Sequence, residues 1–111
     1  MVELRRYERT PIDVDVEFSP RGATARSRGR AKDISLGGMF VETAASAPFG
    51  TEVVVLLLPP GQKVTIAIPA VVRWSGAKGM GLQFGLLGAR ETHAITELAR
   101  ARTRAASKPS F

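Results

Sequence analysis

Apolar and polar residues alternate over most of the first two thirds of the chain. The clearest case is the run from residue 12 to residue 18, Ile-Asp-Val-Asp-Val-Glu-Phe, in which even positions are apolar and odd positions are acidic. A period of two places successive side chains on opposite faces of a strand, so this run predicts a half-buried strand with its carboxylates in solvent. Residues 25–32 alternate four cations with small residues. They predict a second strand that pairs with the first, with cations across from carboxylates.

Further runs with turn residues between them predict strands at residues 39–43, 51–58, 64–74 and 78–85. The second of these is the most apolar run in the chain, and we expect both of its faces to be covered, although a helix is an open alternative there. Pro69 interrupts the third run and predicts a bulge or an edge. The glycines of the last run allow curvature or the close approach of another backbone.

The period changes after Gly88. Ile95, Leu98 and Ala99 follow helical spacing within an alanine-rich segment, which predicts one helix from Ala89 to about Arg104. Six sequential strands followed by one helix predict a mainly β fold, a six-stranded antiparallel β-barrel with one C-terminal α-helix.

Length and composition limit the class of protein. The 111 residues suffice for one core, and we expect a barrel domain at residues 11–106, an N-terminal arm at 1–10 and a frayed tail at 107–111. The chain has no cysteine, which excludes a disulfide framework and a thiolate metal site. No uncharged apolar run reaches the ~18 residues of a membrane span, so we expect a cytoplasmic protein.

Charge and reactive side chains narrow the function further. The net charge of +6 favours an anionic partner but leaves open a dinucleotide, a nucleic acid, a membrane surface or an acidic protein. His93 is the only histidine and has no second ligand type at a matching spacing, so no metal site is expected. No triad or convergent pair of carboxylates is visible, which favours a protein without enzymatic activity.

Two short motifs carry candidate binding chemistry. Arg5 and Arg9 form Arg-x-x-x-Arg before the first strand. Asp33, Ser35 and Gly38 form Asp-x-Ser-x-x-Gly between the second and third strands. Guanidinium groups pair with phosphates and with the acceptor edge of guanine, whereas a carboxylate accepts from the N–H donors of guanine. Together the motifs indicate a guanine nucleotide site.

In order and spacing these motifs resemble those of the PilZ family of bacterial cyclic di-GMP (c-di-GMP) receptors, and the resemblance covers nearly the whole chain. It implies a ligand site built from both motifs, a neighbouring arginine and a tryptophan: Arg5, Arg6, Arg9, Asp33, Ser35, Gly38 and Trp74. The motif arginines would bind phosphates and guanine acceptor edges, and Arg6 would add positive charge. The aspartate and serine would contact the opposite side of the ligand. The glycine, which has no side chain, would allow the backbone to lie close to the ligand. Trp74 is the weakest member, because a partly buried barrel tryptophan is the simpler interpretation.

The resemblance implies a second-messenger receptor or adaptor without enzymatic activity, whose only ligand is c-di-GMP. Its arm would become ordered on binding, and the altered surface would be presented to a downstream protein. Leu4, directly before the first motif arginine, implies one ligand per domain. Three alternatives stay open: a PilZ-like protein-interaction adaptor that does not bind the nucleotide, a small basic barrel that binds nucleic acid, and an unrelated hydrolase.

Overall fold

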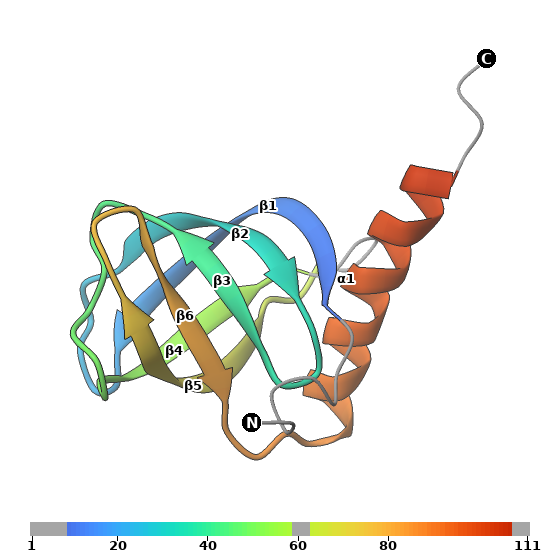
Figure 1. Cartoon of the computed structure of the whole chain (residues 1–111). Coiled ribbons are helices and arrows are strands. Elements are labelled where there is room, and N and C mark those ends of the chain that lie inside the picture. The colour runs from blue at the N-terminus through green and yellow to red at the C-terminus, as the bar shows by residue number, and fades with distance from the viewer. Residues whose placement is uncertain (1–8, 59–62, 108–111) are drawn as a thin grey trace.

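The computed structural model describes residues 9–58 and 63–107 of the chain. Its elements are the strands β1 (Thr10–Pro20), β2 (Ser27–Ile34), β3 (Gly38–Glu42), β4 (Glu52–Leu57), β5 (Ile66–Ser75) and β6 (Gly79–Phe84), and the helix α1 (Ala89–Ser107). The strands form a closed antiparallel barrel in the order β1-β2-β3-β6-β5-β4, and α1 lies across one end of it (Figure 1). The predicted six-stranded barrel with one C-terminal helix is confirmed.

The barrel interior holds the apolar positions of every strand. On β4, Val53, Val55 and Leu57 are at most 2% exposed, and each of the other strands contributes residues of the same kind. The helix completes the core with Ile95 and Leu98, which are 1% and 6% exposed. Fully burying an aliphatic side chain of this size stabilises the fold by ~1.5–3 kcal/mol, so this pair anchors α1 to the barrel.

The segment predicted at residues 51–58 is a strand, which excludes the helix alternative. The expectation that both its faces are covered is wrong on the outer side. Val54 and Leu56 are only partly buried there, and Leu58 is 59% exposed. A barrel strand has one face in the core, and the outer face is covered only where another element packs on it.

β1 and β2 pair as the alternating charges predict. Asp15 lies opposite Arg30 and Glu17 opposite Arg28 in the ladder. Arg26 donates a hydrogen bond of 3.1 Å to the Glu17 carboxylate. The carboxylates of one strand therefore neutralise the cations of the next on the outer surface.

Of the bulge or edge predicted at Pro69, the bulge is absent, and the residue lies at the end of the ladder between β5 and β6; the register shift of β5 lies between Val72 and Trp74. The Pro69 carbonyl accepts a hydrogen bond of 2.9 Å from the Gly85 N–H, directly beyond the last residue of β6. The N and O atoms of one residue in an antiparallel strand point toward the same neighbouring strand. The Pro69 nitrogen therefore points toward the chain beyond the end of β6, where the ladder between β5 and β6 has ended. The missing N–H is tolerated there. In β6 the close approach expected at the glycines is confirmed, because a Cβ on Gly79 would overlap the Val41 carbonyl oxygen.

Candidate functional site

A β-bulge in β2 turns Asp33 outward. Ala31 and Ile34 both point into the core and are 0% exposed, so the two residues between them, Lys32 and Asp33, both face the outside. The pairing of β2 with β3 passes from Ala31–Val41 directly to Asp33–Phe40, which leaves Lys32 as the extra residue. Strict alternation would have placed Asp33 in the core with Ala31. The bulge instead presents its carboxylate at the surface, as bulges near binding sites often do.

Arg9 and Asp33 bring the two sequence motifs together. The Arg9 Nη2 atom lies 3.0 Å from Asp33 Oδ1, and the two side chains are 48% and 31% exposed. The same Oδ1 accepts a hydrogen bond of 3.3 Å from the Phe40 N–H, which fixes the carboxylate against β3. An exposed ion pair of this kind contributes only ~0.2–1 kcal/mol, so a competing ligand can displace it.

Ser35 and Gly38 form the turn that follows Asp33. Ser35 is 5% exposed, and its N–H donates to the Gly38 carbonyl at 2.9 Å. Its Oγ accepts from the Gly37 N–H at 3.1 Å and donates to the Gly38 carbonyl at 3.5 Å. A Cβ on Gly38 would overlap the Leu82 carbonyl oxygen of β6. The contacts of both residues therefore account for the shape of the turn that follows Asp33 at the end of β2.

Two aromatic rings lie in one row with Asp33 on the outer surface. The registers place Asp33 beside Phe40, Phe40 beside Gly81 and Gly81 beside Trp74, across β2, β3, β6 and β5. Since Gly81 has no side chain, the rings of Phe40 and Trp74 meet over it with centroids 5.9 Å apart. Trp74 is 54% exposed, so it is a partly buried tryptophan of the barrel that lies on the outer surface and not in the core.

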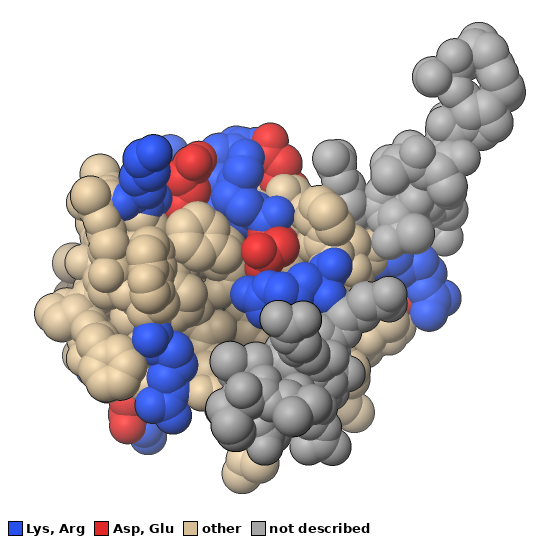
Figure 2. Space-filling model, in the orientation of Figure 1, with Lys and Arg blue, Asp and Glu red and all other residues tan. Residues whose placement is uncertain are grey.

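Phe40 is the residue of this row that the sequence analysis missed. Met39 and Val41 face inward, which leaves Phe40 outward, and the register places it beside Asp33. Residues 39–41 are all apolar, so the sequence contained no signal for this neighbour. Figure 2 shows charged atoms of both signs gathered over β1 and β2, beside a broad uncharged surface over β3 and β6. The candidate site lies where these two kinds of surface meet.

The cations next to the site are held by carboxylates of β1. Arg30 Nε donates to Asp13 Oδ1 at 2.8 Å, and its Nη1 donates to Asp15 at 2.6 Å. Lys32 Nζ donates to Asp13 at 3.2 Å. Hydrogen bonds from Arg30 and then from Lys32 lower the pKa of Asp13, and the Asp13 carboxylate raises the pKa of Arg30. The predicted pairing of the two charged strand faces is thus confirmed.

Other expected features fall partly outside the described residues. Arg5, Arg6 and Leu4 lie outside them, as does most of the predicted arm. Thr10, assigned to the arm from the sequence, is the first residue of β1. Within residues 9–58 and 63–107, no group of three or more His, Cys, Asp or Glu side chains is arranged to hold a metal ion. In the same part of the chain, α1 is too polar to be a membrane-spanning helix.

The structure is thus a closed barrel on whose outer surface Asp33, near the end of β2, meets an arginine from the segment before β1. The family model of the PilZ domain matches residues 3–101, and the chain belongs to this family.

Several solved structures share the fold. The inhibitor of motility MotI/DgrA from Bacillus subtilis has a TM-score of 0.69 and 25% identity, with 94% of this chain and 53% of that chain covered. The PilZ domain of YcgR from Escherichia coli with c-di-GMP has a TM-score of 0.68 and 18% identity, with 92% and 93% covered. The PilZ domain of CeSA from a cellulose-synthesizing bacterium has a TM-score of 0.70 and 19% identity, with 85% and 96% covered. No curated protein matches the chain.

Proposed function

We propose that this chain is a cytoplasmic bacterial receptor for c-di-GMP that acts as an adaptor and has no enzymatic activity. The observation that carries the proposal is the 3.0 Å contact between Arg9 and Asp33, in which a cation of the first motif meets the carboxylate of the second. A guanine nucleotide offers N–H donors for the carboxylate and acceptor atoms for the guanidinium. Each of the two side chains can therefore release the other and bind the ligand instead. Membership of the PilZ family and the c-di-GMP complexes of structural neighbours, such as that of the YcgR domain, support this choice of ligand.

Binding would proceed by displacement of the Arg9–Asp33 pair. Asp33 would accept from the N–H donors of one guanine, while Arg9 would turn to a phosphate or to the acceptor edge of a guanine. The exposed pair is worth at most ~1 kcal/mol, whereas a charge-assisted hydrogen bond contributes ~1.5–3 kcal/mol. The exchange is therefore favourable once two or more such bonds form.

Phe40 and Trp74 would supply a stacking surface for a guanine. Their rings lie in the same outward row as Asp33, and Trp74 leaves more than half of its surface exposed. Stacking of a base on an aromatic side chain is worth ~1–3 kcal/mol, as much as one charge-assisted bond. A purine held at its edge by Asp33 and on its face by these rings would be fixed in two directions.

The remaining motif residues would act around this centre. Arg5 would grip the ligand together with Arg9, and Arg6 would add positive charge. Ser35 and Gly38 would maintain the turn that follows Asp33. The Ser35 hydroxyl oxygen, which accepts one hydrogen bond within the turn, would accept a second from the ligand. The arm that carries the arginines would close over the bound ligand, and the changed surface would be presented to a partner protein.

A calorimetric titration with c-di-GMP, compared with GTP and a short single-stranded oligonucleotide, tests the proposal. We expect saturable binding of c-di-GMP only. If the wild-type chain does not bind c-di-GMP at high micromolar concentration, the receptor function is wrong and a nucleotide-independent adaptor takes its place. Binding of the oligonucleotide alone would instead assign the chain to the nucleic-acid-binding barrels.

A further inference from the structure

A second β-bulge lies at the end of the aromatic row that is farther from Asp33. The pairing of β5 with β6 passes from Val72 directly to Trp74, which leaves Arg73 as the extra residue of β5. Val72 faces the core and is 0% exposed, whereas Arg73 and Trp74 are both exposed on the outer surface. The bulge therefore presents a guanidinium directly beside the exposed tryptophan of the candidate site.

The Arg73 side chain is held by a neutral partner. Its Nε donates a hydrogen bond of 2.7 Å to Gln83 Oε1 on β6. Gln83 is the next outward residue of β6 after Gly81, over which the rings of Phe40 and Trp74 meet. Two residues of a strand span ~7 Å, and their side chains lie on the same face. The guanidinium is thus fixed on the outer face that carries the rings, on the side of the β2–β3 turn.

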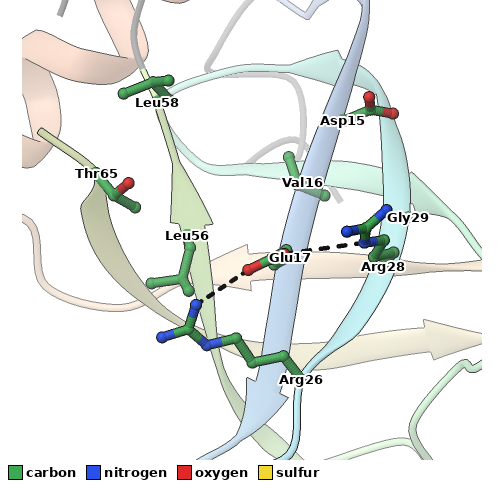
Figure 3. Close-up of a pocket in the computed structure, with 9 residues that line it drawn as sticks. All are labelled: Asp15, Val16, Glu17, Arg26, Arg28, Gly29, Leu56, Leu58 and Thr65. Carbon is green, nitrogen blue, oxygen red and sulfur yellow. Dashed lines mark hydrogen bonds and ion pairs between the residues drawn. The ribbon is translucent and has the colours of Figure 1, made fainter. Parts of the chain in front are cut away.

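Arg73 differs from the other cations of the barrel strands in its charge balance. Arg28, Arg30 and Lys32 of β2 lie 3.9, 2.8 and 3.2 Å from carboxylates of β1. Figure 3 shows one of these pairs, Arg28 with Glu17. Among the side chains that the structure describes, no carboxylate lies within ion-pair distance of Arg73. Its charge is therefore left for an anion from outside the barrel.

The donors of Arg73 suit a phosphate. A guanidinium carries five N–H groups, and the contact with Gln83 uses the one on Nε. The four N–H groups on Nη1 and Nη2 can donate in parallel to two oxygens of one phosphate, a geometry that a lysine does not offer. Gln83 thus orients the guanidinium without using these four donors.

The orientation of a bound guanine would bring its phosphate toward Arg73. The N–H donors of guanine are on the six-membered ring, whereas the sugar and phosphate are attached through the five-membered ring. A base whose donors face Asp33 and whose plane lies on Phe40 and Trp74 therefore directs its sugar and phosphate toward β5. The row from Asp33 to Trp74 crosses three strand spacings, ~14 Å in all, and Arg73 lies at the end that the phosphate would reach.

We propose that Arg73 is a further ligand-binding residue of the nucleotide site, outside both sequence motifs, and that it binds a phosphate of c-di-GMP. The inference rests on the proposed function, because it assigns a contact within that site. It places a cation at each end of the row, Arg9 beside Asp33 and Arg73 beside Trp74. The ligand carries two phosphates and can engage both cations at once.

Calorimetric titration of c-di-GMP into variants of the full-length chain tests the proposal. Arg73→Gln should weaken binding at least about tenfold through the loss of one charge-assisted contact, and Arg73→Lys should lose less because it keeps the charge. Gln83→Ala removes the same 2.7 Å hydrogen bond but keeps the guanidinium, so its affinity should stay within about threefold of wild type. The control Arg28→Gln removes one charge from an 89% exposed side chain near the start of β2 and should bind as wild type does.

These variants separate a ligand contact from a structural role. If Arg73 only links β5 to β6, then Arg73→Gln and Gln83→Ala remove the same link and should lower the affinity equally. That result would overturn the proposal. The affinity of the wild type should also fall more steeply with added salt than that of Arg73→Gln, because the variant lacks one of the charges that salt screens.

Phosphorus NMR of bound c-di-GMP identifies the group that Arg73 contacts. We expect Arg73→Gln to shift a phosphorus resonance of the bound ligand and Arg28→Gln to shift none. Shifted guanine imino resonances with unchanged phosphorus resonances would place the guanidinium on the base and overturn the assignment. Equal binding by wild type and Arg73→Gln would overturn this inference alone, whereas a wild-type chain that does not bind c-di-GMP would overturn the proposed function as well.

Discussion

Asp33 shows how one side chain acquires a role from a local irregularity of the backbone. Its carboxylate is outward because β2 carries an extra residue at Lys32, and it is held in place by the Phe40 N–H. Its cationic partner in the described structure is Arg9. Since each of these contacts is weak, the carboxylate is held at the surface without being locked to the protein, as the proposed ligand contact requires.

The motif arginines give the first prediction. Replacing both Arg5 and Arg9 with alanine should weaken c-di-GMP binding by at least ~2 kcal/mol, since one bidentate arginine–guanine contact alone is worth ~1–3 kcal/mol. The measurement is calorimetric titration, with circular dichroism to verify the fold. The matched control is the double variant Arg26→Ala/Arg28→Ala, which removes the same charge from the start of β2, at the opposite end of this strand from Asp33. If both double variants lose the same affinity, general electrostatic attraction rather than a site explains the binding.

Trp74 gives a second prediction. Trp74→Ala should lower the affinity for c-di-GMP by ~1–3 kcal/mol through lost stacking, with little change in the free energy of unfolding because the ring is 54% exposed. Quenching of the single tryptophan by c-di-GMP in the wild type provides an independent readout. Phe49→Ala, which removes the aromatic ring of a residue that is 67% exposed in the loop before β4, should leave the affinity unchanged. An unchanged affinity for Trp74→Ala would remove the stacking surface from the proposal.

The Asp13 carboxylate predicts a pH dependence of stability. Arg30 and Lys32 hold its folded-state pKa below the ordinary value of 3.8, so the native state binds this proton less tightly than the unfolded chain does. The resulting stabilisation is present above pH 3.8 and is lost as the pH falls through the lowered folded-state pKa. In urea unfolding, Asp13→Asn should therefore be destabilised relative to wild type at about pH 6, and the difference should shrink at about pH 2.5. An equal difference at both pH values would contradict this assignment.

Among the secondary-structure elements, β1 is the barrel strand to which the arm is directly connected. The strand begins at Thr10, directly after Arg9, so any movement of the arm is transmitted to a residue that is already paired with Ile34 of β2. The barrel itself is closed and offers no strand edge for rearrangement. A change on ligand binding is therefore expected in the arm and not in the strands.

This expectation is tested by NMR. On addition of c-di-GMP, the amide resonances of residues 4–9 should change from sharp and poorly dispersed to dispersed and rigid, because a dianionic ligand bridges the arginines to Asp33. The amides of β1 beyond Thr10 should hardly shift. Resonances of residues 4–9 that are already rigid without ligand, or still mobile at saturation, would falsify the closing-arm mechanism even if binding itself were verified.

For the molecule as a whole, the barrel surface divides into regions of different chemistry. β1 and β2 carry paired charges, β3, β6 and the end of β5 carry the candidate nucleotide site, and the outer face of β4 and β5 carries apolar side chains between Glu52 and Arg73. Substitutions outside the candidate site can therefore serve as controls that leave it intact.

Ligand binding should also stabilise the entire fold. A ligand that binds only the native state at about 100 times its Kd raises the free energy of unfolding by ~2.7 kcal/mol. Thermal unfolding of the wild type should therefore shift upward by several degrees with c-di-GMP and not with GTP. In the Arg5→Ala/Arg9→Ala variant, a loss of ~2 kcal/mol in binding leaves the ligand at about 3 times the variant's Kd, so the upward shift should fall to about one third of that of the wild type. A shift that is equal for both nucleotides would indicate nonspecific anion binding.

Local patterning was sufficient for the elements. Alternation over residues 12–18 and 25–32 predicts β1, β2 and their pairing, and helical spacing of Ile95 and Leu98 predicts α1 and its buried face. These features depend on side chains a few positions apart, whose relation is set by the period of the backbone. The same holds for Ser35, which lies in the turn between β2 and β3 as predicted, whereas Asp33, predicted in that turn, belongs to β2.

Only the folded chain decided which strands lie side by side. β3 pairs with β6, and β6 with β5, although β4 follows β3 in the sequence, and this order places Phe40, Gly81 and Trp74 in one row with Asp33. The bulge at Lys32 and the overlap that excludes a side chain at Gly38 likewise involve partners from other strands. Alternation specifies the face on which a residue lies but not its cross-strand neighbour, because strand order and register are set by the packing of the closed barrel as a whole.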